Sequence, residues 1–279
     1  MGVGRRLAAA VVLTAGAVLV SGCGLGAQQA GPVALAGAPA PGRAATPAVT
    51  INVTPVSRVL AAEPFVAPHG TLRFGAKGVT VKVLQARLRE LGYMPGKIDS
   101  RYGGTTQSAV WAFQKVQGIS PTSTVNSRTW RALEAPKAPQ VLVPTGKPDR
   151  VEVNLTKQIA VLYRAGQVKL ITHISSGSGI PYCETATWQG KTQRFCGDAR
   201  TPTGDFKTTW RRSGWHKSYL GQLYNPIFFN GGIALHGALS VPLAPASHGC
   251  VRLPMHVAQV LPSLLGTGVP VHVRGKFQR

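Results

Sequence analysis

The chain has 279 residues, enough for one or two domains. Its 31 Lys and Arg residues outnumber 9 Asp and Glu, and this net charge of +22 favours anionic partners such as wall polymers, a membrane surface or nucleic acid. The N-terminus argues against nucleic acid, because it has the features of an export signal. We therefore expect no nucleic-acid partner.

Residues 1–22 are predicted to be a signal peptide. Arg5 and Arg6 supply the positive end, and residues 7–20 form an uninterrupted run of apolar or small side chains. Fourteen residues are too few to span a hydrocarbon core of about 30 Å comfortably, so a transmembrane helix is disfavoured. The run ends in Val-Ser-Gly-Cys at Cys23, which resembles the lipobox of bacterial lipoproteins.

The lipobox resemblance implies that Cys23 is lipidated and becomes the new N-terminus, anchoring an exported protein to the outer face of the cytoplasmic membrane. Removal of residues 1–22 leaves 29 basic and 9 acidic side chains, a charge of +20. The alternative is a plain signal peptide that is cleaved nearby, with Cys23 incidental.

Residues 23–70 are rich in Ala, Pro and Gly and are predicted to form a tether, and residues 71–135 a compact bundle of three short helices. Thr80, Thr105 and Asn126 are the expected N-caps. Gly92 and Gly118 are expected to end the first two helices. The inward-facing side chains recur at helical spacing: Val81, Leu84, Leu88, Leu91; Ala109, Ala112, Phe113, Val116; Trp130, Leu133.

Residues 136–148 contain four prolines and are predicted to be a stiff linker. Residues 149–275 are predicted to form a mostly-β, sandwich-like domain with one or two helices. Its expected strands are 151–155, 159–163 and 168–174, a β-meander, followed by 206–210, 233–235 and 269–273. We expect a loop insertion at 179–200 and a helix at 254–261 that Pro262 breaks or kinks.

A candidate catalytic pair lies near the end of this domain. An apolar strand ends at His236, which a rigid element would hold as general base for the thiol of Cys250. The backbone carbonyl of Gly237 is placed to orient the imidazole, as a carboxylate does in other triads. Gly249 allows a tight turn whose amides face an oxyanion, and Ser247 is expected to support that loop.

Two neighbours of the cysteine have open roles. We expect His248 to be structural or to position substrate. Arg252 is either a clamp for a substrate carboxylate or part of a structural ion pair, and the scarcity of acids favours the clamp.

The order His236-Gly237, then Ser247-His248-Gly249-Cys250-Val251-Arg252, resembles the signature of the YkuD-type L,D-transpeptidases over roughly residues 148–275. Three further motifs occur in the family's order: Ser176-Gly177-Ser178, Thr201–Phe206 and Asn225-Pro226. The resemblance implies that the Cys250 thiolate attacks a peptidoglycan stem between its third residue, a diamino acid, and D-Ala. It also implies a thioester, transfer to an amine of another stem with a 3→3 cross-link, and modification of Cys250 by carbapenem-type β-lactams.

The helical region resembles the three-helix peptidoglycan-binding domains. The resemblance rests on Val81–Leu88, Leu91-Gly92-Tyr93, the stretch from Thr105 to Gln114, and Thr129-Trp130 with Leu133. It departs from that family where Ser100 replaces the glycine of an Asp-Gly turn. The resemblance implies that this region binds wall glycan.

If Cys23 carries lipid and Cys250 stays free as the nucleophile, Cys183 and Cys196 remain as a disulfide pair in an oxidising compartment. We expect neither a metal nor a cofactor.

Other functions stay open on the sequence alone. Attack by water instead of an amine would make the protein an L,D-carboxypeptidase, and a wall-binding lipoprotein would need no catalysis at all. A zinc-dependent carboxypeptidase is disfavoured, because the histidines lack a ligand pattern with acids. A papain-like hydrolase is disfavoured because its histidine follows the cysteine, whereas His236 precedes Cys250.

Overall fold

The computed structural model describes residues 64–277. The expected signal peptide, Cys23 and most of the predicted tether lie outside this range. Within it, no helix has both the length and the apolar character needed to cross a membrane.

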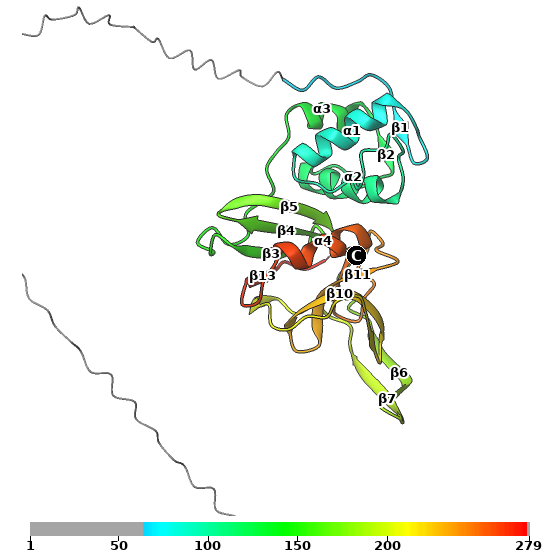
Figure 1. Ribbon diagram of the computed structural model, residues 1–279, viewed down its shortest axis with the longest axis vertical. Helices are drawn as coiled ribbons and strands as arrows, with labels where there is room; N and C mark the ends of the chain where they lie inside the picture. The colour runs from blue at the N-terminus through cyan, green and yellow to red at the C-terminus, as the bar shows by residue number, and fades with distance from the viewer. Residues whose placement is uncertain (1–63, 278–279) are drawn as a thin grey trace, which may run out of the picture. The chain divides into compact units, whose positions relative to one another are not determined.

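The N-terminal region contains the three predicted helices (Figure 1). They are α1 (Val79–Glu90), α2 (Gly104–Gln117) and α3 (Ser127–Glu134), with β1 (Leu72–Arg73) pairing antiparallel to β2 (Thr124–Val125). Asn126 caps α3 by accepting a hydrogen bond from the Thr129 amide at 3.1 Å. The other two predicted caps are wrong: the N-caps of α1 and α2 are Gly78 and Gly103, each two residues before the predicted threonine.

Two sheets form the C-terminal region. The five-stranded sheet has the order β5-β4-β3-β13-β8, from β3 (Arg150–Asn154), β4 (Ile159–Arg164), β5 (Gln167–His173), β8 (Gly204–Lys207) and β13 (Pro270–Arg274). The four-stranded sheet has the order β12-β11-β10-β9, from β9 (Trp215–Ser218), β10 (Gly221–Asn230), β11 (Ile233–Ala238) and β12 (Val251–Pro254). Buried residues of both sheets and of α4 (Met255–Leu264) share one hydrophobic cluster. The mostly-β prediction is confirmed.

The predicted loop at 179–200 is wrong, because these residues form an antiparallel hairpin of β6 (Pro181–Trp188) and β7 (Lys191–Asp198) (Figure 1). Gln189 and Gly190 both have positive φ, 51° and 78°, which is the geometry of a tight hairpin turn. Cys183 and Cys196 are opposite each other in the register and form a disulfide. The strands are largely exposed, so their sequence lacks the alternation that identifies a half-buried strand.

Pro262 was expected to break or kink the helix, and it does not break α4, which continues through it. Proline removes the amide that would bond the carbonyl four residues earlier, here Ala258. The side-chain amide of Asn225 donates to that carbonyl at 3.1 Å, so the helix continues to Leu264 without an unpaired oxygen.

The helices pack directly on the five-stranded sheet. Tyr93 pairs with Ile171 in a parallel bridge, and the Ile171 amide donates to the Gly92 carbonyl at 2.9 Å. The buried residues of the helices form one hydrophobic cluster with one face of the sheet: Ile159, Val161, Tyr163 and Ile171. Strand β4 is therefore buried on both faces, which explains why its residues do not alternate between buried and exposed.

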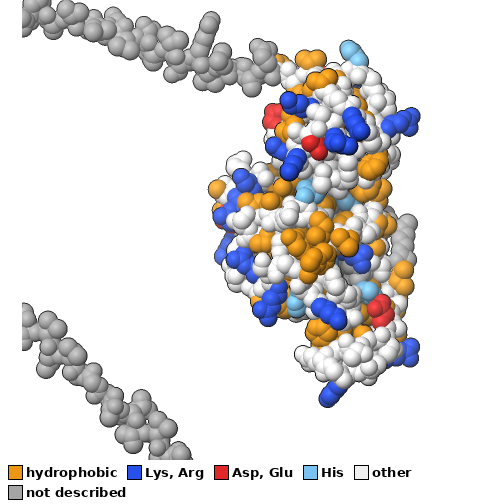
Figure 2. All heavy atoms as spheres, turned by 45° about the vertical axis from the view of Figure 1, so that its right-hand side comes forward, with side chains coloured by type: hydrophobic (Ala, Val, Ile, Leu, Met, Phe, Trp, Pro, Cys, Tyr) orange, Lys and Arg blue, Asp and Glu red, His pale blue; other side chains and the backbone are white. Residues whose placement is uncertain are grey.

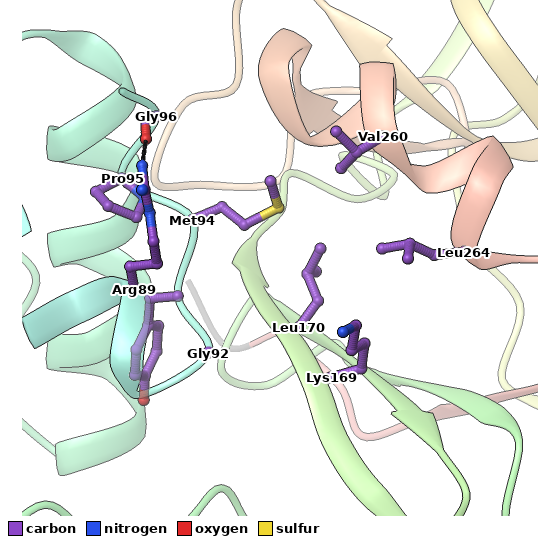
Figure 3. A pocket seen from close by; sticks show the side chains of 10 residues that line it. Arg89, Gly92, Met94, Pro95, Gly96, Lys169, Leu170, Val260 and Leu264 are labelled. Carbon is purple, nitrogen blue, oxygen red and sulfur yellow. Dashed lines mark hydrogen bonds between the residues drawn. The ribbon is translucent and has the colours of Figure 1, made fainter. Parts of the chain in front are cut away.

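A cavity of 360 Å³ opens where the helices meet β5 and α4 (Figure 3). Met94, Leu170, Val260 and Leu264 give it an apolar lining, and the exposed Arg89 donates to the Gly96 carbonyl at 2.6 Å. None of its lining residues belongs to the predicted catalytic motif. Lys and Arg side chains are spread over the face of the protein in Figure 2, with few acids among them.

Candidate active site

The register of β11 and β12 brings the predicted catalytic residues to one face of a sheet. These strands are parallel, with Leu235 opposite Val251 and His236 opposite Arg252. Paired residues and residues two apart share a face, so His236 points to the same side as Ala234. Cys250 packs against the cluster that contains Ala234. The thiol and the imidazole are therefore diagonal neighbours on one face.

His236 is held in one orientation. It is 5% exposed, and its Nδ1 lies 2.9 Å from the Gly237 carbonyl oxygen, so Nδ1 carries the proton and Nε2 keeps a lone pair. Burial lowers the pKa of His236 to about 4, so the ring is neutral at pH 7. Gly237 leaves room for α4, since a Cβ there would lie 2.8 Å from the Ala258 Cβ.

The Cys250 thiol is half-buried, and its Sγ lies 3.7 Å from the Gly232 carbonyl oxygen. Burial raises the pKa of Cys250, while a hydrogen bond to the Ala234 backbone and the nearby Arg252 charge oppose that rise. At neutral pH the pair is thus a protonated thiol beside a neutral imidazole. A base must remove the proton as the sulfur reacts.

The loop before β12 is held by two hydroxyls. The Ser247 hydroxyl donates to the Cys250 carbonyl at 2.5 Å and accepts from the Gly249 amide at 3.0 Å. The Thr201 hydroxyl donates to the Gly249 carbonyl at 2.6 Å and accepts from the Gly177 amide at 2.8 Å. The Gly249 amide is therefore engaged within the loop.

Glycine is required at position 249. Its φ is 139°, and an added Cβ would lie 2.9 Å from the Arg200 carbonyl oxygen. Gly177 faces the same segment even more closely, with its hypothetical Cβ 2.4 Å from the Ala199 carbonyl oxygen. The Ser176-Gly177-Ser178 motif and the loop that contains Gly249 thus pack against the same backbone segment at residues 199–200.

The β6–β7 hairpin reaches the catalytic loop through His248. Nε2 of His248 lies 2.8 Å from Oε1 of Glu184, and its ring contacts Tyr182 at 4.6 Å between centroids. Burial raises the pKa of Tyr182, and the nearby Tyr219, Glu184 and Cys250 raise it further. A 400 Å³ cavity lies between the base of the hairpin and this loop. Sequence reasoning missed Glu184, because no local pattern links a hairpin carboxylate to a histidine 64 residues later.

Arg252 is a half-buried cation beside the pair. Across residues 64–277, no carboxylate forms an ion pair with it. The same part of the chain holds no group of three His, Cys, Asp or Glu residues arranged to bind a metal ion.

Two family profiles match the chain. The L,D-transpeptidase catalytic domain (YkuD) matches residues 148–273, and the putative peptidoglycan-binding domain matches residues 77–133. None of the curated proteins is similar enough to count as a match.

Among solved structures, the L,D-transpeptidase (residues 123–326) from Xylanimonas cellulosilytica is 38% identical, with a TM-score of 0.65, covering 74% of this chain and 99% of that one. The L,D-transpeptidase from Stackebrandtia nassauensis is 24% identical, with a TM-score of 0.40 and coverages of 76% and 97%. The first similarity spans both the helical region and the two sheets, and the chain belongs to the L,D-transpeptidase family.

Proposed function

We propose that this protein is a cysteine-dependent peptidoglycan L,D-transpeptidase. The observation that supports this most is the common face of His236 and Cys250, with Nδ1 of the imidazole fixed on the Gly237 carbonyl. That arrangement leaves Nε2 as the free base next to a thiol that needs one.

The first half-reaction breaks the bond between the third stem residue and D-Ala. Nε2 of His236 takes the thiol proton while Sγ of Cys250 bonds to the carbonyl carbon of the third residue, a diamino acid. The tetrahedral oxyanion is stabilised by the Cys250 amide, because the Gly249 amide already binds Ser247. The imidazolium then returns its proton to the leaving amine, so D-Ala departs and a thioester remains.

The second half-reaction transfers the acyl group. The side-chain amine of another stem attacks the thioester carbonyl, His236 takes its proton, and the thiolate leaves and is reprotonated. The product is a 3→3 cross-link. If water attacks instead, the same intermediate gives a tripeptide and the enzyme acts as an L,D-carboxypeptidase.

Substrate binding falls to the groups around this pair. Arg252 is a half-buried cation with no carboxylate partner in the described range, so it is suited to clamp a stem carboxylate. His248 is positioned by Glu184 from the hairpin. Both matched domains are peptidoglycan-acting, which places the protein at the cell wall, and we propose that a lipid on Cys23 anchors it there.

The test is intact mass spectrometry after incubation with a purified disaccharide-tetrapeptide, beside Cys250→Ala. An acyl adduct that depends on Cys250, with D-Ala release and a dimeric 3→3 product, would establish the transpeptidase. An adduct that resolves only to tripeptide would establish a carboxypeptidase. Folded protein with a reduced Cys250 that gives neither adduct nor D-Ala would leave a wall-binding protein.

A further inference from the structure

A buried polar contact joins helix α2 to the end of β5. Nζ of Lys115 lies 2.8 Å from Nδ1 of His173 and donates to the Gln158 carbonyl at 3.2 Å. Trp111, one turn earlier on α2, meets the His173 ring edge-on at 5.3 Å. His173 is fully buried and Lys115 is partly buried, so the contact is largely shielded from water.

His173 also contacts the loop that precedes the catalytic motif. Because the ammonium or amine of Lys115 donates to Nδ1, the proton of the imidazole sits on Nε2, which donates to the Val241 carbonyl at 3.0 Å. Val241 lies in the segment that runs from the end of β11 to Ser247.

Gln158 provides a second route to the same loop. Its side chain donates to the Ser176 hydroxyl and accepts from the Ser176 amide, both at 2.8 Å. The Ser176 carbonyl in turn accepts from the amides of Ala246 and Ser247, at 2.9 and 3.0 Å. Ser247 is the residue whose hydroxyl holds the Cys250 carbonyl.

We propose that Lys115 is a positioning residue for the Cys250 loop, so that docking of the helical region on the sheet sets the reactivity of the thiol. This inference rests on the proposed role of Cys250 as nucleophile. It makes the helical region part of the catalytic apparatus in addition to any wall-binding role.

A purely structural role for Lys115 predicts something different. Burial lowers the pKa of Lys115 to about 7, so keeping the amine in this place is unfavourable for folding. Methionine fills similar space without a charge, but it leaves Nδ1 of His173 and the Gln158 carbonyl without a donor, which lowers stability and opposes the gain from removing the buried amine. A purely structural role would therefore change only the free energy of unfolding, whereas loop positioning predicts that Lys115→Met also slows the reaction of Cys250 in the folded protein.

The experiment compares the full-length chain with Lys115→Met and with Lys82→Met. Lys82 is an exposed lysine on α1, so its variant removes the same charge from the same region and leaves the contacts of Lys115 with His173 and Gln158 intact. The rate of alkylation of Cys250 by iodoacetamide is read by peptide mass, and hydrogen exchange is measured at the amides of Ala246 and Ser247. Thermal unfolding is recorded for every variant.

We expect Lys115→Met to slow Cys250 alkylation about tenfold and to speed exchange at both amides at a temperature where its thermal unfolding shows it to be folded, while Lys82→Met matches the native chain. If Lys115→Met does not fold, His173→Asn replaces it. Asparagine keeps an oxygen near the Nδ1 position for Lys115 but loses the contact with Val241, and we expect the same slower alkylation and faster exchange.

Alkylation and exchange at native rates in the folded variant would overturn the inference. Because iodoacetamide needs no stem peptide, the comparison stands even if the native chain fails to form an acyl adduct with tetrapeptide. That failure would refute the proposed transpeptidase and leave the coupling between Lys115 and the loop as a separate result.

Discussion

Nδ2 of Asn225 donates to the carbonyl of Ala258 at 3.1 Å, and this bond replaces the one that Pro262 removes from helix α4. Oδ1 of the same side chain accepts from the Gly214 amide at 2.6 Å. Asn225 has a φ of 46°, a left-handed conformation that asparagine tolerates better than most residues. One side chain therefore holds the irregular part of β10 at the Asn-Pro motif, where the pairing with β11 shifts register, and completes the helix α4.

We expect Asn225→Gly to lower the free energy of unfolding by about 1–3 kcal/mol, because a half-buried carbonyl loses its partner while glycine keeps the left-handed backbone. Urea denaturation measures this. Asn225→Ala also strains the left-handed backbone, so its free energy of unfolding should be lower still. A glycine variant as stable as the native chain would show that the two hydrogen bonds contribute nothing.

Activity should persist to a lower pH than it would if the base were a histidine with an ordinary pKa. Only the neutral ring of His236 can accept the thiol proton, and burial lowers its pKa to about 4. The neutral fraction therefore stays high from pH 7 down to about pH 5 and is lost as the pH falls through 4. We expect kcat/KM for D-Ala release to fall along an acid limb near pH 4.

An NMR titration of the His236 ring in Cys250→Ala supplies the control, since it needs no substrate. A ring that titrates near 6.5 would contradict the displaced limb.

Replacing Gly249 by alanine should disable the catalytic loop without unfolding the protein. The methyl group would press on the Arg200 carbonyl, and a φ of 139° strains any L side chain. We expect acylation of Cys250 by a carbapenem to slow by at least about a hundredfold, measured by intact mass. Gly190→Ala, in the exposed hairpin turn, is the matched control for positive φ. If a carbapenem acylates the Gly249→Ala variant at the native rate, the loop must accommodate the added methyl group without losing its catalytic geometry.

Arg252→Gln tests the carboxylate clamp. Glutamine keeps a hydrogen-bond donor but loses the charge and the two-pronged geometry of the guanidinium. We expect the KM for the tetrapeptide donor to rise about tenfold, with a smaller change in kcat. The Arg252 charge also lowers the pKa of Cys250, so its loss should shift alkylation of the thiol toward higher pH. An unchanged KM would mean that Arg252 does not bind the substrate carboxylate and has a structural role instead.

The sequence was most informative where chemistry and local pattern coincide. His236 and Cys250 were predicted as a catalytic pair because one is a base at a strand end and the other a thiol after glycine, and their catalytic roles stay a prediction. The three helices followed from apolar spacing, and Asn126 from its capping geometry.

Features that depend on distant segments were not predictable. Lys115 and His173 are 58 residues apart, and each alone looks like a surface lysine or a packing histidine. The continuation of α4 through Pro262 was not predictable for the same reason, because the donor that compensates for the proline lies 37 residues away in sequence on another element.

The contact of Gly92 and Tyr93 with Ile171 also concerns how the protein avoids self-association. β5 is the last strand of its sheet, and an uncovered edge offers unpaired amides and carbonyls to any other chain. The helical region occupies part of that edge and hides the apolar face formed by Ile159, Val161, Tyr163 and Ile171. A catalytic region cut free at the proline-rich segment would therefore expose an unpaired strand edge and an apolar face together, and we expect it to aggregate more readily than the intact chain.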